Sequence, residues 1–391
     1  MVIKAADRLE GVSEYYFSTK LKEIANLNKD GAGIINLGIG SPDLPPPDSA
    51  ISELNEQATD LKAHGYQSYT GVPELRKEIA RWMRSDYSVE FNSVEEILPL
   101  IGSKEGIMHI SMAFLNPDDK VLVPNPGYPT YQAVTRLVQA EAVSYDLDEE
   151  AGWQIDFQKL MKLPLDQVKL MWVNFPNMPT GSKGTLEQFD RLIYLAKKHR
   201  FLIVNDNPYS QLFNGDPLSI FQAKGAKEIC LELNSLSKSH NMAGWRLGWV
   251  AGAKEYIQAI LKVKSNMDSG MFLPLQKAAI KALESPEQWK SDLIKSYEKR
   301  RVLAFEIMEA LDCSFDKNQD GLFVWARAPE SIRDVEEWVN SIIHNAGVFI
   351  TPGFIFGSMG NRYLRISLCA PEALLSQSLD RIMASREKLL P

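Results

Sequence analysis

The sequence is poor in cysteine and histidine. It has three cysteines among 391 residues, and no two of them have C-x-x-C spacing, so the sequence predicts neither a disulfide framework nor a thiolate metal site. The five histidines are scattered and form no H-x-x-x-H or H-E-x-x-H pair. We therefore expect no metal in the protein.

Polybasic blocks and long apolar runs are also missing. The net charge of -7 does not favour binding to a phosphate backbone, so no nucleic-acid partner is expected. No apolar run approaches the roughly 18 residues that a membrane-spanning helix needs. Residues 1–11 carry charges throughout and do not resemble a signal peptide. These absences favour a cytoplasmic protein without a membrane partner.

The two common nucleotide-binding patterns are absent as well. Gly38 and Gly40 open the segment N-L-G-I-G-S-P-D, but no third glycine follows at the spacing of a dinucleotide site, and Pro42 obstructs a helix start. The phosphate-loop pattern G-x-x-x-x-G-K-[ST] does not occur. A nucleotide-binding α/β enzyme is therefore disfavoured.

What the chain does have is enough length and apolar content, 45%, for a large globular enzyme. The proline-rich segment P-D-L-P-P-P-D at residues 42–48 is typical of an extended linker. After residue 285 the pattern changes to a long charged helix, followed by short strands and helices of a compact α+β unit. We expect a large domain at residues 46–284 and a small domain made of residues 1–45 and 285–391.

The most informative stretch is S-L-S-K-S-H-N-M-A-G-W-R-L-G-W, residues 235–249, which follows a buried apolar run. A lysine becomes a nucleophile near neutral pH only if its pKa falls from roughly 10.4 or if it is already bound as an imine. Next to Lys238, the hydroxyls of Ser235 and Ser237 and the guanidinium of Arg246 suit a phosphate group. A lysine for an aldehyde beside donors for a phosphate points to pyridoxal phosphate. The alternative is a solvated loop with an ordinary surface lysine.

An acidic residue ends the apolar run F-L-I-V-N-D at residues 201–206. The carboxyl ends of strands are where open α/β sheets bind ligands. A buried carboxylate at Asp206 needs a cation, and a protonated pyridine nitrogen about 4 Å away would supply attraction on the order of 4 kcal/mol. The alternative is a helix cap after a strand.

A second phosphate contact is predicted where the apolar run at residues 97–101 ends. Gly102, Ser103 and Lys104 open a helical pattern there, and the free amides of a helix start attract phosphate. Ser103 alone is equally typical of a simple helix cap.

The motif S-x-S-K followed by G-W-R-L-G resembles the cofactor-lysine motif of class I and II aminotransferases, and the likeness extends over residues 36–367. This resemblance implies fold type I: an α/β large domain with a mostly parallel central sheet flanked by helices, and a smaller α+β domain. It also implies a homodimer with shared active sites. The implied reaction moves the amino group of an L-amino acid to a 2-oxo acid through a pyridoxal phosphate Schiff base on Lys238.

The resemblance assigns roles to further residues. It implies that Tyr128 stacks on the pyridine ring, that Tyr209 donates to the phenolic oxygen, and that Tyr69 reaches the cofactor phosphate of the neighbouring subunit. It also implies that Arg365 binds the substrate carboxylate, which approaches the backbone at Gly40. From the residues alone, Tyr128 is equally a turn tyrosine and Arg365 an outward-facing strand residue.

One position departs from the family. In F-P-N-M-P-T-G, Met178 stands where the family usually has an asparagine that bonds the phenolic oxygen. One lost hydrogen bond to a charged oxygen is worth about 1.5 to 3 kcal/mol, enough to change the pKa of the Schiff base without abolishing cofactor binding. Asn177 is a candidate replacement, unless its side chain points away.

The substrate stays open. L-G-I-G-S-P-D-L-P and K-S-N-M-D-S-G resemble the LL-diaminopimelate branch of the family, and Lys104, at the cofactor site, matches a residue that faces the distal acidic group. Aspartate, methionine and aromatic transaminases share most of these features. A lyase or decarboxylase on the same scaffold is the nearest alternative. An effector-sensing regulator is disfavoured because the roughly 45 residues before the large domain are too few for a DNA-binding unit.

Overall fold

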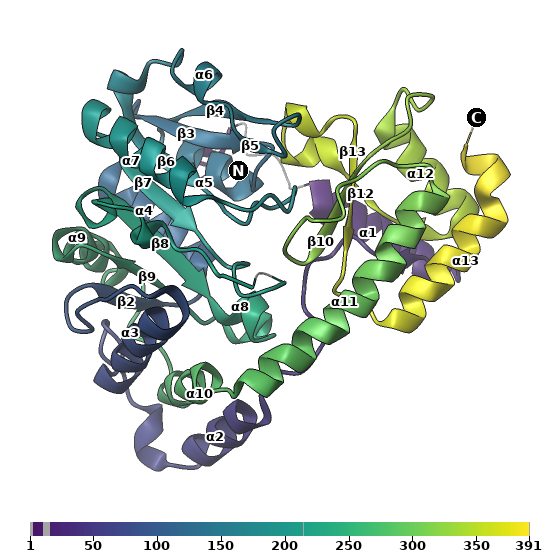
Figure 1. The fold of residues 1–391 in the computed structure, drawn as a ribbon. Helices are drawn as coiled ribbons and strands as arrows, with labels where there is room; N and C mark the ends of the chain where they lie inside the picture. The colour runs from purple at the N-terminus through teal and green to yellow at the C-terminus, as the bar shows by residue number, and fades with distance from the viewer. Residues whose placement is uncertain (1–2, 11–15, 214, 391) are drawn as a thin grey trace.

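The computed structural model describes residues 3–10, 16–213 and 215–390. Its centre is an eight-stranded sheet with the order β2-β9-β8-β7-β6-β3-β4-β5 (Figure 1). The five strands from β8 to β4 are parallel, and the pairs β2–β9, β8–β9 and β4–β5 are antiparallel. The strands are β2 (Ile97–Leu100), β3 (Lys120–Asn125), β4 (Glu141–Asp148), β5 (Gln154–Ile155), β6 (Val168–Val173), β7 (Leu202–Asp206), β8 (Cys230–Ser235) and β9 (Gly248–Gly252).

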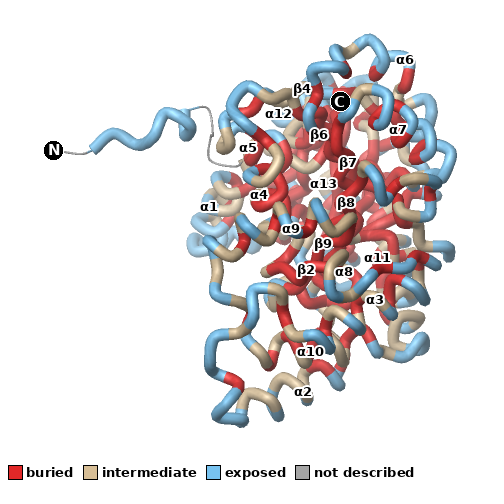
Figure 2. Tube along the Cα trace, turned by 90° about the vertical axis from the view of Figure 1, so that its left-hand side faces the viewer, coloured by how far each residue is buried: buried red, intermediate tan, exposed pale blue. Residues whose placement is uncertain are grey.

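Both faces of this sheet are covered, which explains the near-continuous apolar runs of its central strands. Along β6, Leu170 and Trp172 pack on one side with α4 (Ser103–Phe114), α5 (Pro129–Leu137) and α9 (Lys254–Lys264). Met171 and Val173 pack on the other side with α7 (Leu186–His199). Figure 2 shows the sheet buried, with the exposed residues on the outer helices. The parallel part of the sheet thus has the three-layer architecture that the resemblance implies.

Helix α7 illustrates how sequence positions these layers. The Thr185 hydroxyl accepts a hydrogen bond from the amide of Gln188 at 3.1 Å and so caps the helix start. Leu192, Ile193 and Ala196 repeat at helical spacing and are buried against the sheet. The helix ends where Arg200 takes a left-handed conformation, with φ 62°.

Strands of the C-terminal part form two small sheets beside the central one (Figure 1). Strands β10 (Phe323–Arg327), β13 (Tyr363–Ser367) and β12 (Thr351–Pro352) are antiparallel, and β1 (Ile35–Asn36) pairs in parallel with β11 (Val348–Phe349). This last pairing brings residues before 46 next to residues after 285. The pairing agrees with the expectation that residues 1–45 and 285–391 form one small domain. The boundaries of the two domains stay a prediction.

The remaining helices complete both parts. Helices α2 (Asp48–Ala58), α3 (Pro73–Tyr87) and α10 (Leu273–Leu283) pack at one end of the central sheet, and the long α11 (Glu287–Ala310) runs from there to the small sheets (Figure 1). Helices α1 (Tyr16–Lys29), α12 (Val335–Ala346) and α13 (Glu372–Leu389) pack around the small sheets, and α6 (Phe157–Leu160) and α8 (Leu236–Ser239) are single turns. No helix within the described residues is long and apolar enough to cross a membrane.

The proline-rich segment at residues 42–47 contains no helix or strand and is held by side chains. The buried guanidinium of Arg300 binds both carboxylate oxygens of Asp43, at 2.5 and 3.0 Å, and also donates to the carbonyl oxygen of Leu368 at 3.1 Å. The Asn241 amide donates to the Pro45 carbonyl oxygen at 3.2 Å. Long-range hydrogen bonds therefore fix the backbone that leads from the small sheets to α2.

Candidate active site

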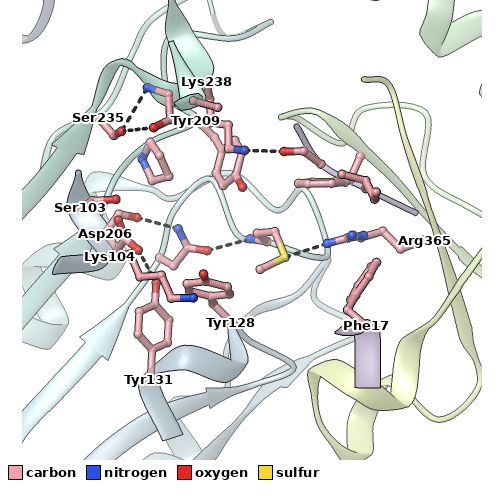
Figure 3. Close-up of a pocket in the computed structure, with 18 of the residues that line it drawn as sticks. Phe17, Ser103, Lys104, Tyr128, Tyr131, Asp206, Tyr209, Ser235, Lys238 and Arg365 are labelled. Carbon is pink, nitrogen blue, oxygen red and sulfur yellow. Dashed lines mark hydrogen bonds between the residues drawn. The ribbon is translucent and has the colours of Figure 1, made fainter. Parts of the chain in front are cut away.

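A cavity of about 520 Å³ opens where the carboxyl ends of β6, β7 and β8 meet the small sheets (Figure 3). Every residue that the sequence placed in the site lines this cavity except Tyr69 and Asn177. The lining residues that were predicted are Gly40, Ser103, Lys104, Tyr128, Asp206, Tyr209, Ser235, Ser237, Lys238, Arg246 and Arg365. Positions that are up to 325 residues apart, from Gly40 to Arg365, thus come together in one hollow.

Lys238 lies in the single-turn helix α8, directly after β8, and its amine points into the cavity. The ammonium donates a hydrogen bond to the Gly40 carbonyl oxygen. Burial lowers the pKa of Lys238, and the nearby cations Arg365 and Arg246 lower it further. The residue is therefore no ordinary surface lysine, and its amine is more often neutral and nucleophilic than a solvated one.

Asp206 ends β7 and is 4% exposed. The Tyr131 hydroxyl donates a hydrogen bond to its Oδ2 at 2.8 Å, whereas its Oδ1 is buried without a hydrogen-bond partner among the described residues. Burial raises the pKa of Asp206 to about 6, and the bond from Tyr131 opposes this rise. Oδ1 is therefore a buried acceptor that could bind a hydrogen-bond donor or a cation of a ligand.

The start of α4, the Ser235–Ser237 turn and Arg246 form a cup for an anion. The Ser235 hydroxyl donates a hydrogen bond to the Ser237 hydroxyl at 2.9 Å, which leaves the Ser237 hydroxyl hydrogen for a ligand. Gly102 has φ +85°, and a Cβ there would overlap the guanidinium of Arg246. Arg246 pairs with no carboxylate in the part of the chain that the structure describes. The cup therefore offers hydroxyls, a cation and the amides of a helix start to one ligand group.

Arg365 lies on β13 at the opposite end of the cavity and is buried. Its guanidinium donates to the Gly38 carbonyl oxygen at 2.7 Å and to the Met178 sulfur at 3.3 Å, and it lies 4.0 Å from the centre of the Phe323 ring (Figure 3). The side chain does not face outward into solvent. A buried guanidinium facing a cavity suits a planar carboxylate.

The sequence of the chain matches the profile described as aminotransferase class I and II over residues 32–382. The chain belongs to this family. It is an enzyme that moves an amino group between an amino acid and a 2-oxo acid.

Relatives of this aminotransferase cover nearly its whole length. The LL-diaminopimelate aminotransferase of Halothermothrix orenii is 37% identical over 382 residues, covering 97% of this chain and 98% of the relative. The enzyme of the same name from Aquifex aeolicus is 35% identical, covering 96% and 98%. The substrate-bound structure of BacF from Bacillus subtilis is 33% identical with a TM-score of 0.93, covering 100% and 99%. The BacF structure shows the same fold over the full chain.

The residues around the cavity fit pyridoxal phosphate, the cofactor on which the aminotransferase family depends. The unpartnered Oδ1 of Asp206 suits a cationic ring nitrogen. The cup at Gly102, where a Cβ would meet the Arg246 guanidinium, suits a phosphate. The Lys238 amine lines the same cavity and suits the aldehyde.

Two predicted residues of this aminotransferase lie elsewhere. Tyr69 is 45% exposed and does not line the cavity of its own chain. The carboxamide oxygen of Asn177 accepts from the Thr180 hydroxyl at 2.9 Å and its side chain does not reach the cavity. Met178, by contrast, lines the cavity and is held by Arg365. Asn177 is therefore not in a position to replace the missing family asparagine.

Two polar residues that hydrogen-bond Asp206 did not emerge from the sequence. The Asn174 amide donates to the Asp206 backbone oxygen at 2.6 Å, and its oxygen accepts from the Met178 amide at 2.8 Å. Tyr131 holds Asp206 and stacks on Trp172 with ring centres 5.1 Å apart. Asn174 follows a buried strand directly, as Asp206 does, so strand-end position was the available signal. Tyr131 carried no such signal, because a tyrosine on a helix is equally at home in a core.

No metal was expected in the aminotransferase, but one group of described residues has the side chains of possible metal ligands. Donor atoms of Glu105, His109 and Asp268 lie within 4.8 Å of one another. The buried ammonium of Lys264 lies 2.8 Å from Asp268, and His109 bonds Glu105 at 2.8 Å. The Lys264 ammonium thus already neutralises Asp268. The group forms a charge network between α4 and the end of α9.

Proposed function

We propose that this enzyme holds pyridoxal phosphate covalently on Lys238 and uses it to move the amino group of an L-amino acid to a 2-oxo acid. The observation that carries the proposal is the place of the Lys238 amine, in a cavity with an anion cup at one end and the Arg365 guanidinium at the other. The bound cofactor supplies an electron sink that acidifies the substrate α-carbon. The chain supplies binding, orientation and proton transfer.

With the cofactor bound, Lys238 would serve as the base and acid at the substrate α-carbon. Its lowered pKa favours the neutral amine, which is the form that can accept the proton. Asp206, ionised above about pH 6, keeps the ring nitrogen of the cofactor cationic. Ser103, Ser235, Ser237 and Arg246 hold the phosphate.

Aromatic residues and Arg365 orient the two ligands. Tyr128 would stack on the cofactor ring. Burial raises the pKa of Tyr209, so its hydroxyl stays protonated and could donate to the phenolic oxygen. Arg365 binds the substrate carboxylate beside the Gly40 backbone. With Met178 in place of an asparagine, Tyr209 is left as the single side-chain donor expected at that oxygen.

The enzyme works as a homodimer in this proposal, with Tyr69 reaching the phosphate in the partner's cavity. Its 45% exposure in the single chain supports this role. Mixing the inactive variants Lys238→Ala and Tyr69→Ala tests it, because only a shared site gives heterodimers with one intact centre. Restored activity is expected. No restoration, despite mixed dimers in native mass spectrometry, would contradict the role in trans.

Substrate and compartment complete the proposal. The names of the relatives make LL-diaminopimelate one donor to test. The three cysteines are free thiols and Cys230 and Cys313 are buried, which fits the reducing cytoplasm that we propose as its location.

The function is tested by loading the purified enzyme with cofactor and adding an L-amino acid. The cofactor absorbance should change to that of the amine form, and a 2-oxo acid should reverse the change. Borohydride should fix the cofactor to Lys238, which peptide mass spectrometry locates. An unlabelled Lys238, or no spectral change with any amino acid, would refute the proposal.

A further inference from the structure

We propose that the cavity selects amino acids with a large apolar side chain, branched aliphatic or aromatic, and that an apolar wall of Phe17, Leu21, Ile39 and Phe323 recognises it. All four residues line the cavity. The inference rests on the proposed function, because it takes Arg365 as the site of the substrate carboxylate and Lys238 as the site of its amino group.

Ile39 marks where the substrate side chain must go. Its neighbours bind both key groups through their carbonyl oxygens: Gly38 accepts from Arg365 and Gly40 accepts from Lys238. A substrate whose carboxylate meets Arg365 and whose nitrogen meets Lys238 therefore has its α-carbon beside Ile39. The Ile39 side chain is 42% exposed and lines the cavity, so it offers open apolar surface at this point.

Helix α1 supplies the next part of the wall. Phe17 and Leu21 are four residues apart and so lie on one face of the helix. Phe17 lies near Arg365, with the guanidinium 5.6 Å from its ring centre (Figure 3). Ser18 also lines the cavity, so α1 turns two apolar side chains and one hydroxyl toward the carboxylate site.

This face of α1 is fixed to the small sheets. The Phe17 ring packs edge to face on Phe349, with centres 6.2 Å apart. The Lys20 ammonium donates to the Asn340 oxygen of α12 at 3.0 Å. A wall built on a helix that is anchored in this way can discriminate between side chains, because it does not simply move aside.

The charged groups of the cavity support the same conclusion. Four of the five charged lining residues serve the cofactor or the α-amino and α-carboxylate groups: Asp206, Arg246, Lys238 and Arg365. The fifth, Lys104, lies near Tyr128 and away from Phe17 (Figure 3). Among the described lining residues, Asp206 is the only acid, so a distal ammonium meets no other carboxylate of its own chain there. A charged group against Phe17, Leu21 and Ile39 would lose hydration without compensation. An apolar side chain gains by the same burial.

The first test measures cofactor conversion in single turnovers with alanine, leucine, phenylalanine, glutamate and LL-diaminopimelate. We expect kcat/KM for leucine and phenylalanine to exceed that for alanine by about tenfold or more, since even one methylene in an apolar pocket is worth roughly that factor. Glutamate and LL-diaminopimelate should react more slowly than leucine. A preference for either charged donor would overturn the inference, especially if Lys104→Met abolished it.

The second test changes the wall. Ile39→Asp should lower the ratio of kcat/KM for phenylalanine to that for alanine at least tenfold. Met161→Asp, a matched change at a 55% exposed residue outside the cavity, should leave the ratio as in the parent enzyme. An unchanged ratio in Ile39→Asp would overturn the role of the wall, while conversion by alanine would show that the proposed function stands. If no amino acid converted the cofactor, the proposed function itself would fail and this inference with it.

Discussion

The Tyr131 hydroxyl donates a hydrogen bond to Oδ2 of Asp206 at 2.8 Å, while Oδ1 of the same carboxylate is buried without a partner among the described residues. Helix α5 supplies the tyrosine and strand β7 the acid. One oxygen is therefore held by the protein and the other is left for a ligand. This arrangement makes the cofactor-free enzyme carry a poorly compensated buried charge.

We predict that Asp206→Asn stabilises the cofactor-free enzyme above pH 6. Burial raises the pKa of Asp206 from 3.8 to about 6, so the folded chain binds this proton more tightly than the unfolded chain. The contribution of Asp206 to the free energy of unfolding therefore falls as pH rises from about 4 to 6, and it stays lower above pH 6. The asparagine should raise the free energy of unfolding at pH 8 by up to about 3 kcal/mol and by less at pH 5.

Urea unfolding of both cofactor-free proteins at pH 8 and pH 5 measures this difference. Asp216→Asn, a change at an exposed carboxylate, serves as the control and should have little effect. The Asp206 variant should also bind pyridoxal phosphate more weakly, so its two effects have opposite signs. A loss of stability at pH 8 in the cofactor-free variant would contradict the prediction.

The second prediction concerns the anion cup at Gly102. Gly102→Ala should raise the Kd for pyridoxal phosphate at least tenfold, because the new Cβ displaces the Arg246 guanidinium. Gly31→Ala is the matched control: Gly31 has φ +88° against +85° at Gly102, but nothing lies within 4 Å of its Cβ position. Both variants share the cost of a left-handed alanine. Equal cofactor affinities in a fluorescence titration would refute the role of the cup.

The third prediction concerns acid stability and His240. This histidine is buried and stacks on Trp289 with ring centres 5.7 Å apart, and burial, helped by nearby Lys290, lowers its pKa from 6.5 to about 3. Below pH 6.5 His240 binds a proton in the unfolded chain, but in the folded chain it stays neutral down to about pH 3. Stability therefore falls with pH by about 1.4 kcal/mol per unit from this group alone.

His240→Gln removes this contribution. Between pH 6.5 and pH 5 the variant should lose about 2 kcal/mol less of its unfolding free energy than the parent enzyme does. The exposed His64, replaced in the same way, provides the comparison. Parallel pH profiles for the parent and His240→Gln in urea unfolding would show that the histidine is protonated in the folded state.

The fourth prediction concerns the carboxylate site. Arg365→Lys keeps the charge but loses the planar fork, so kcat/KM for every amino acid should fall by about 100-fold, mainly through KM. Cofactor affinity should change little. Arg362→Lys alters a nearby arginine that bonds the Pro329 carbonyl oxygen at 2.7 Å and does not line the cavity, so it should leave KM unaltered. Unchanged KM values in Arg365→Lys would rule out carboxylate binding there.

The sequence by itself determined the buried central strands of the sheet and the chemistry at their ends. Strands buried on both faces are continuous apolar runs, so a polar residue at the end of a run, such as Asp206 or Ser235, is conspicuous. The short strands and helices expected after residue 285 are present and include β10 and α13. Strand β4 was not identified, because exposed and buried residues interrupt its apolar pattern near the sheet edge.

Only the tertiary structure decided which side chains meet. Tyr128 and Tyr131 are three positions apart, yet it is Tyr131 that binds Asp206, because the first turn of α5 points it at β7. Met178 contacts Arg365, 187 positions away, and Asn177 beside it turns to Thr180. The local sequence pattern fixes where a residue lies along a strand or helix. Which side chains pair depends on how separate elements pack, and this packing is set by contacts between residues far apart in the sequence.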